Sequence, residues 1–227
     1  MSQRGNILFL ILLAVVLFAA LSYAITSSMR GGGNDASKET AEMAATQILQ
    51  NATAIEQAMM RARTVEGIPD YGFNLKGSNS GSTQTNTTCT VSACKIFSDQ
   101  GGSVASVGLP QAAWDDAAKA NGGQNTLFVA AQILDIGTAA EDLVINLPHI
   151  NLATCQALNR AFGLTHSITA IESWGGYVNY TGTLTAFPDA TGIIIGNDVT
   201  ALRGQRSACF YNGVSNGYTF YHVLIAR

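Results

Sequence analysis

The sequence predicts an α+β protein, in which a long N-terminal helix packs on a globular domain with a mainly antiparallel sheet. Two observations predict this class. The first third of the chain has helical periodicity, hydrophobic at first and amphipathic afterwards. The second half is dominated by strand-like runs and ends in two β-rich segments around Asn216-Gly217, a strong hairpin signal. Because the strands follow the helices rather than alternating with them, α+β is favoured over α/β.

The N-terminal segment is strongly apolar. It reads "RGNILFLILLAVVLFAALSYAITSSMRGGG" over 4–33, with no polar residue in 7–21 and no charge between Arg4 and Arg30. As a helix, 7–24 is about 27 Å long, close to the thickness of a bilayer core. After a short leader, 1–5, we therefore expect a hydrophobic transmembrane or filament-core helix over 6–30. Its main apolar side chains are Ile7, Leu8, Phe9, Leu10, Leu12, Val16, Phe18 and Leu21.

A glycine triplet, Gly31-Gly32-Gly33, follows this segment. Each glycine costs a helix about 1 kcal/mol relative to alanine, so 31–34 is predicted to be a hinge. An amphipathic helix is predicted over 35–66, ended by Gly67 and Pro69. Its apolar face recurs at spacings of three and four and consists of Ala41, Ala44, Ile48, Ala52, Ile55, Met59 and Ala62.

The remaining chain, 67–227, is predicted to form the globular head domain. Its polar segment 76–88 suits only a loop. Short helices are expected over 111–120 and 150–163, the latter capped by Asn151 and ended by Gly163. Besides the terminal hairpin, strands are expected within 126–136, although helix is an alternative there, and within 142–147, 166–174 and 192–196.

Four cysteines behind an export-type segment indicate an oxidising compartment and two disulfides. Three pairings exist on paper. Cys89 and Cys94 are separated by four residues and are expected to close a small loop, which leaves Cys155 with Cys209.

Composition and motifs give no sign of an enzyme. Charged residues are 12% of the chain and the net charge is −3, without a Lys/Arg cluster, so no nucleic-acid partner is expected. His149, His166 and His222 lack metal-ligand spacing. The sequence "GVSNG" (213–217) matches the pattern of a nucleophile elbow. However, strand-like sequence follows it and no Asp or Glu lies further along the chain, so a turn is expected. We expect no catalytic, cofactor or metal site.

Three sites match the N-glycosylation acceptor pattern: Asn51, Asn86 and Asn179. They are candidate modification sites in an exported protein.

The N-terminus has three interpretations. It could be a secretory signal cleaved after Ala24, where "SYA" supplies small residues, which would leave a secreted soluble binding domain. It could be a single anchor of a periplasmic protein. It could also be the assembly helix of a filament, which accounts for the amphipathic helix that follows.

The order of leader, apolar helix, amphipathic helix and strand-rich domain, with "CQALNRAFG" and a cysteine-bounded C-terminal region, resembles the type IV pilin superfamily. The resemblance implies that Gly5 precedes the prepilin-peptidase cut and that Asn6 becomes the N-terminus. Leu10 stands where the family has a glutamate. The implied function is a structural subunit of an extracellular pilus-like filament. The subunit would be held in the inner membrane and handled by the pilus assembly machinery before it polymerises with its own copies.

Overall fold

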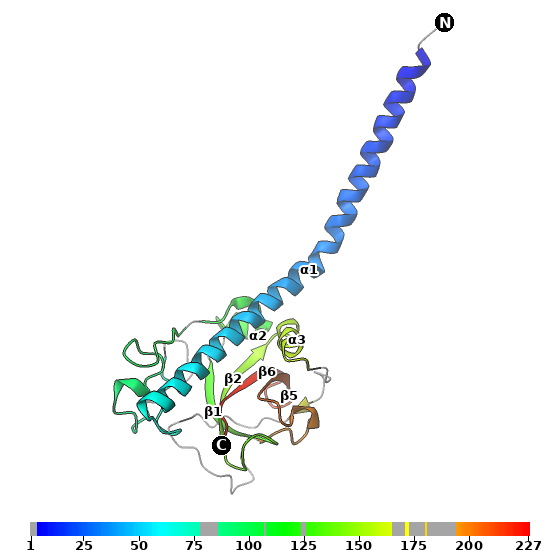
Figure 1. Ribbon diagram of the computed structural model, residues 1–227. Coiled ribbons are helices and arrows are strands. Elements are labelled where there is room, and N and C mark those ends of the chain that lie inside the picture. The colour runs from blue at the N-terminus through cyan, green and yellow to red at the C-terminus, as the bar shows by residue number, and fades with distance from the viewer. Residues whose placement is uncertain are drawn as a thin grey trace. The chain divides into compact units, whose positions relative to one another are not determined.

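The computed structural model describes residues 4–77, 86–106, 108–123, 126–164, 171–172, 180 and 194–227 (Figure 1). The chain divides into two compact units, Met1–Thr40 and Ala41–Arg227. Helix α1 (Arg4–Glu66) supplies the N-terminal part of both units. The rest of the second unit holds two further α-helices, six strands and three 3₁₀ turns in the part of the chain that the structure describes.

The predicted hinge over 31–34 is wrong, because α1 is helical without a break from Arg4 to Glu66. The glycine penalty of about 1 kcal/mol per residue is real. However, extending an existing helix fixes one residue per hydrogen bond, whereas starting a second helix after a break requires a new and unfavourable nucleus. The helical segments on both sides therefore carry the helix through the triplet.

The prediction of a long apolar helix able to span a membrane is also overturned. Within the described residues, no helix is both long enough and apolar enough to cross a bilayer. The apolar stretch whose side chains are described without a gap, 11–23, measures about 20 Å as a helix. A hydrocarbon core is about 30 Å thick.

The amphipathic half of α1 is confirmed and lies across one face of the sheet (Figure 1). All seven residues of the predicted apolar face are buried, with at most 4% of each exposed. Ile48, Ile55 and Met59 are the largest of them, and they join a core cluster with Phe128, from the sheet. The spacing of three and four therefore identified the buried face correctly.

The sheet is mixed rather than mainly antiparallel. It contains β1 (Leu127–Ile133), β2 (Asp142–Ile150), β3 (Ile171–Glu172), β4 (Ile194–Ile195), β5 (Ser207–Asn212) and β6 (Gly217–Ile225). The strand order is β3-β5-β6-β2-β1-β4. The three inner pairings are antiparallel, but each edge pairing, β3 with β5 and β4 with β1, is parallel.

The sheet has a core on both faces. The face toward α1 carries Phe128, Ile145 and Phe220, and helix α3 (Leu152–Ala161) packs beside α1 on it. The opposite face carries a second cluster that includes Val144, Tyr221 and Leu202 of the 3₁₀ turn η3 (Thr200–Leu202). Each central strand therefore contributes alternate residues to two apolar layers, as burial on both sides requires.

Several local predictions are confirmed. Asn151 caps α3 through its side-chain oxygen, which accepts from the Thr154 amide at 2.9 Å, and Gly163 follows the helix at φ +69°. The segment 126–136 contains β1 (Leu127–Ile133) and no helix. The predicted helix over 111–120 is split into the 3₁₀ turn η2 (Gln111–Ala113) and α2 (Asp116–Ala120). Most of 166–174 and of 76–88 lies outside the described residues.

Both predicted disulfides are present. Cys89 pairs with Cys94 across a Cα–Cα distance of 5.6 Å, and Cys155 pairs with Cys209 across 5.3 Å. The first bond closes the loop around the 3₁₀ turn η1 (Ser92–Cys94). The second joins α3 to β5 and is fully buried.

Candidate functional site

The feature with the clearest functional meaning is the apolar part of α1 within the first unit. Ten large apolar side chains between residues 9 and 23 are between 46% and 77% exposed. They are Phe9, Ile11, Leu12, Leu13, Val15, Val16, Leu17, Phe18, Leu21 and Tyr23. We call this set the apolar collar.

The apolar collar covers every side of the helix. Residues 11–13 and 15–18 are consecutive, and successive side chains on an α-helix are separated by about 100°. A helix that is apolar all round is normally buried. A partner with a single flat face could cover only one side of this helix.

Small residues interrupt the apolar collar at Ala14, Ala19 and Ala20. Such residues allow helix backbones to approach closely, which increases van der Waals contact between packed helices. Of the predicted filament-core residues, Phe9, Leu12, Val16, Phe18 and Leu21 belong to the apolar collar. Ile7, Leu8 and Leu10 lie in α1, as do the predicted processing residues Gly5 and Asn6, but those side chains are outside the described set.

In the second unit, a polar cluster that the sequence did not predict joins α1 to the sheet. The Ser207 hydroxyl oxygen lies 2.6 Å from Nδ1 of His222, and Nε2 of that ring lies 3.1 Å from a Glu56 carboxylate oxygen. Arg206 donates to the other Glu56 oxygen at 2.9 Å. The order Ser-His-Glu has the chemistry of a nucleophile, a base and an orienting acid.

The burial of this cluster shows a structural role. Ser207 and His222 are 7% and 9% exposed, directly opposite each other on β5 and β6 and on the face that α1 covers. They line neither the groove along α1 nor the pocket around Phe97. Burial lowers the pKa of His222, Glu56 acts in the opposite direction, and Arg206 lowers it further. No spacing rule links Glu56 to strands so far along the chain, so sequence reasoning could not find this cluster.

The structure describes one of the two remaining histidines and the turn over 213–217 that resembles a nucleophile elbow. His149 contacts Asp115, with 3.0 Å between Nδ1 and Oδ2, and its backbone has φ +60°. The strand β6 follows the "GVSNG" turn directly, so no nucleophile elbow forms. His166 is outside the described residues. In the part of the chain that the structure describes, no group of three His, Cys, Asp or Glu side chains could hold a metal ion.

The glycosylation candidates differ in their environments. Asn86 is 3% exposed, and its amide nitrogen donates to the Tyr71 and Phe73 carbonyls at 2.7 and 2.8 Å. Attaching a glycan would replace one of the two Nδ2 hydrogens that make these bonds. Asn51 is half-buried on α1, and Asn179 lies outside the described residues.

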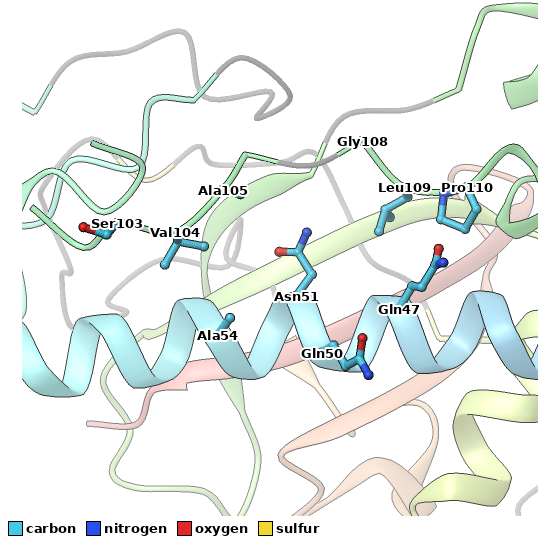
Figure 2. A pocket seen from close by; sticks show the side chains of 10 residues that line it. All are labelled: Gln47, Gln50, Asn51, Ala54, Ser103, Val104, Ala105, Gly108, Leu109 and Pro110. Carbon is cyan, nitrogen blue, oxygen red and sulfur yellow. The ribbon is translucent and has the colours of Figure 1, made fainter. Parts of the chain in front are cut away.

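A groove of about 520 Å³ runs along the second-unit part of α1 (Figure 2). One wall is the helix, from which Gln47 and Asn51 point toward residues 103–105 and 108–110. Those residues form the other wall, from which Val104 and Leu109 point back toward the helix (Figure 2). The full lining consists of Gln47, Gln50, Asn51, Ala54, Ser103, Val104, Ala105, Gly108, Leu109 and Pro110. No charged side chain is among them, so the groove suits a neutral ligand.

Comparisons of the chain with models of known protein families, with curated proteins and with solved structures find no match.

Proposed function

We propose that this protein is the structural subunit of an extracellular, pilin-like filament, held together by packing of apolar collars from many copies. The observation that carries the proposal is the apolar collar itself: ten large apolar side chains exposed on all sides of one helix. Burying a Leu, Val or Phe side chain contributes about 1.5–3 kcal/mol. A bundle of collars would remove this surface from water on every side at once.

Other features support the same proposal. The chain has no charge between Arg4 and Arg30, so nothing in this segment opposes transfer into an apolar bundle. The second unit has its own core on both sheet faces and two disulfides, which suit an oxidising space outside the cytoplasm. In this arrangement the second unit decorates the outside of the filament, and the partners of each subunit are its own copies.

Substituting Leu12 by aspartate tests the proposal. The 64% exposed side chain would place an uncompensated carboxylate in the bundle. We expect Leu12→Asp to abolish sedimentable polymer, while circular dichroism still reports a folded second unit. The control is Val65→Asp, because Val65 is 71% exposed on the same helix but far from the apolar collar.

Two results would contradict the proposal. One is polymer formation by Leu12→Asp at the wild-type level. The other is a mature protein whose first residue, measured by mass spectrometry, is Ile25, because removal of the preceding residues would eliminate the apolar collar.

A further inference from the structure

The unpaired polar atoms of the second unit are concentrated at one end of the sheet. Among the described residues, six buried side-chain atoms have no hydrogen-bond partner. Five of them belong to Asn146 on β2, Asn212 on β5, Thr219 on β6, and Ser215 in the turn between β5 and β6. We call these four residues the amide–hydroxyl patch. Because buried polar groups in native proteins are almost always paired, the concentration indicates a shared partner.

The three patch residues on strands share one face of the sheet. Each lies two positions from a side chain of the second core cluster on its own strand. The pairs are Asn146 with Val144, Asn212 with Phe210, and Thr219 with Tyr221. Because side chains alternate between the two faces of a sheet, all three point to the face opposite α1.

The strand register gives the spacing within the patch. Tyr221 pairs with Asn146, and Thr219 pairs with Phe210. Thr219 is therefore a diagonal neighbour of both Asn146 and Asn212, with Cβ atoms about 7 Å apart. No hydrogen bond joins these side chains directly. The spacing suits a small molecule that bonds to two of them at once.

The His149–Asp115 pair lies beside the patch. An added Cβ at Gly217 would lie 3.0 Å from Nδ1 of His149 and 3.6 Å from an Asp115 carboxylate oxygen. Gly217 pairs directly with Asn212, so the histidine ring lies at the Asn212 end of the patch. Both side chains of the pair are 27% exposed, whereas the three patch residues on strands are fully buried. The pair therefore marks the side on which the patch approaches solvent.

The chemistry of the patch selects a neutral ligand that both donates and accepts. Oδ1 of Asn212 accepts from the Val214 amide at 2.9 Å, so its nitrogen is the unpaired atom. The unpaired nitrogens of Asn146 and Asn212 would repel a cation, and the unpaired oxygen of Asn146 would repel an anion. Each unpaired atom exposes less than 1 Å² to solvent. Such burial suits a ligand of the size of water.

We propose that the amide–hydroxyl patch holds ordered internal water, which pairs Thr219 with Asn146 and Asn212. A buried water makes about three hydrogen bonds, and the patch offers that number from three adjacent strands. The water fastens β2, β5 and β6 to one another through their side chains on the face opposite α1. This site belongs to the second unit alone and does not depend on polymerisation.

A crystal structure of the full-length chain, at a resolution that reveals ordered solvent, tests the site directly. We expect a water oxygen at about 2.5–3.2 Å from Oγ1 of Thr219 and from a side-chain atom of Asn146 or Asn212. The proposal is overturned if no water lies there, if an ion or a larger molecule takes its place, or if these side chains bond to one another.

Two matched variants test the same site in solution. Thr219→Val and Thr154→Val make one change at two fully buried threonines, each with an unpaired hydroxyl. Thr154 lies on α3, on the other side of the sheet, and cannot share water with the patch. Thr219→Val should raise the unfolding equilibrium constant about tenfold, because the water loses a partner. Thr154→Val should leave it unchanged or lower it, because it removes a hydroxyl that has no partner.

Urea unfolding of the full-length variants in non-ionic detergent, followed by circular dichroism, measures both constants. Equal changes for the two variants, or a Thr219→Val chain as stable as the wild type, would contradict the proposal. If Thr219→Val does not fold, the crystal structure of the wild type still decides the question.

Discussion

Single buried polar residues hold the loops of the second unit in place. Asn159, on α3, bonds to both the amide and the carbonyl of Cys209 at 2.8 Å. Glu172 is 1% exposed and accepts from the Val199 amide at 2.7 Å. Asp142 is fully buried and accepts from the amides of Ile133 and Arg227 at 3.3 and 2.9 Å. Each contact replaces water that the buried group has lost, so removing one would leave a costly unpaired atom.

Asp142 should make stability depend on pH. Burial raises the pKa of its carboxyl from 3.8 to about 6, although the two amides oppose this. The folded state therefore binds this proton more tightly than the unfolded state does. The contribution of Asp142 to the free energy of unfolding should increase as pH falls from 7 to 4, by on the order of 2 kcal/mol. Asp142→Asn should remove that slope, measured by urea unfolding at several pH values.

The difference in unfolding free energy between Asp142→Asn and the wild type, followed against pH, reports the titration of Asp142 alone. This matters because burial also raises the pKa of Glu172 and lowers that of His222, and the two act on stability in opposite directions as pH falls. The control is Asp116→Asn, whose carboxylate is fully exposed. Parallel pH profiles for Asp142→Asn and the wild type would contradict the assignment.

At the scale of elements, the apolar seam between α1 and the sheet holds the second unit together. Met59 is fully buried in it, whereas its neighbour Met60 is 54% exposed. Met59→Ala should lower the free energy of unfolding by about 2–4 kcal/mol, because it removes buried methylene groups and leaves a cavity. Met60→Ala changes the same atoms in solvent and should have almost no effect. If chemical denaturation showed the same loss of unfolding free energy for Met59→Ala and Met60→Ala, the seam would not be the source of the stability.

Elements governed by local rules were predictable from the sequence. The spacing of Ile48, Ile55 and Met59 gave the buried face of α1, and an asparagine before a helical pattern gave the cap of α3. The Asn216-Gly217 pair gave the terminal hairpin, where Asn216 has φ +52°. In each case the residues that decide the structure lie within a few positions of one another.

The pairing of other elements depends on distant partners and was missed. Strands β3 and β4 lie within the predicted strands 166–174 and 192–196, but they have only two residues each, and their parallel pairing with β5 and β1 was not predicted. Such short segments carry no distinctive periodicity, and their pairing is decided by tertiary packing. The hinge prediction failed for a related reason, since it weighed each glycine alone and ignored the cooperativity of the helix around it. Likewise, Glu56 meets His222, whose other ring nitrogen contacts Ser207, only because α1 lies across β5 and β6.

For the molecule as a whole, the candidate site was only partly predictable. The sequence identified the apolar collar, because an unbroken apolar run needs no partner information to be recognised. The groove was not identified, because its walls come from α1 and from residues 103–105 and 108–110, which are far apart in the chain. The proposed contact between copies is uncharged, because the side chains of the apolar collar carry no charge.

This neutrality predicts how the proposed filament responds to solvent. Raising the salt concentration from about 0.1 to about 1 M shortens the Debye length from ~10 to ~3 Å and weakens exposed ion pairs. It leaves burial of apolar surface intact, and sulfate strengthens it. Sedimentation should therefore show the polymer unchanged in sodium chloride and favoured by ammonium sulfate. A non-ionic detergent should dissolve it, because detergent chains cover the apolar collar as well as another helix does. Dissolution by sodium chloride, combined with resistance to detergent, would instead mean that charged contacts between second units hold the copies together.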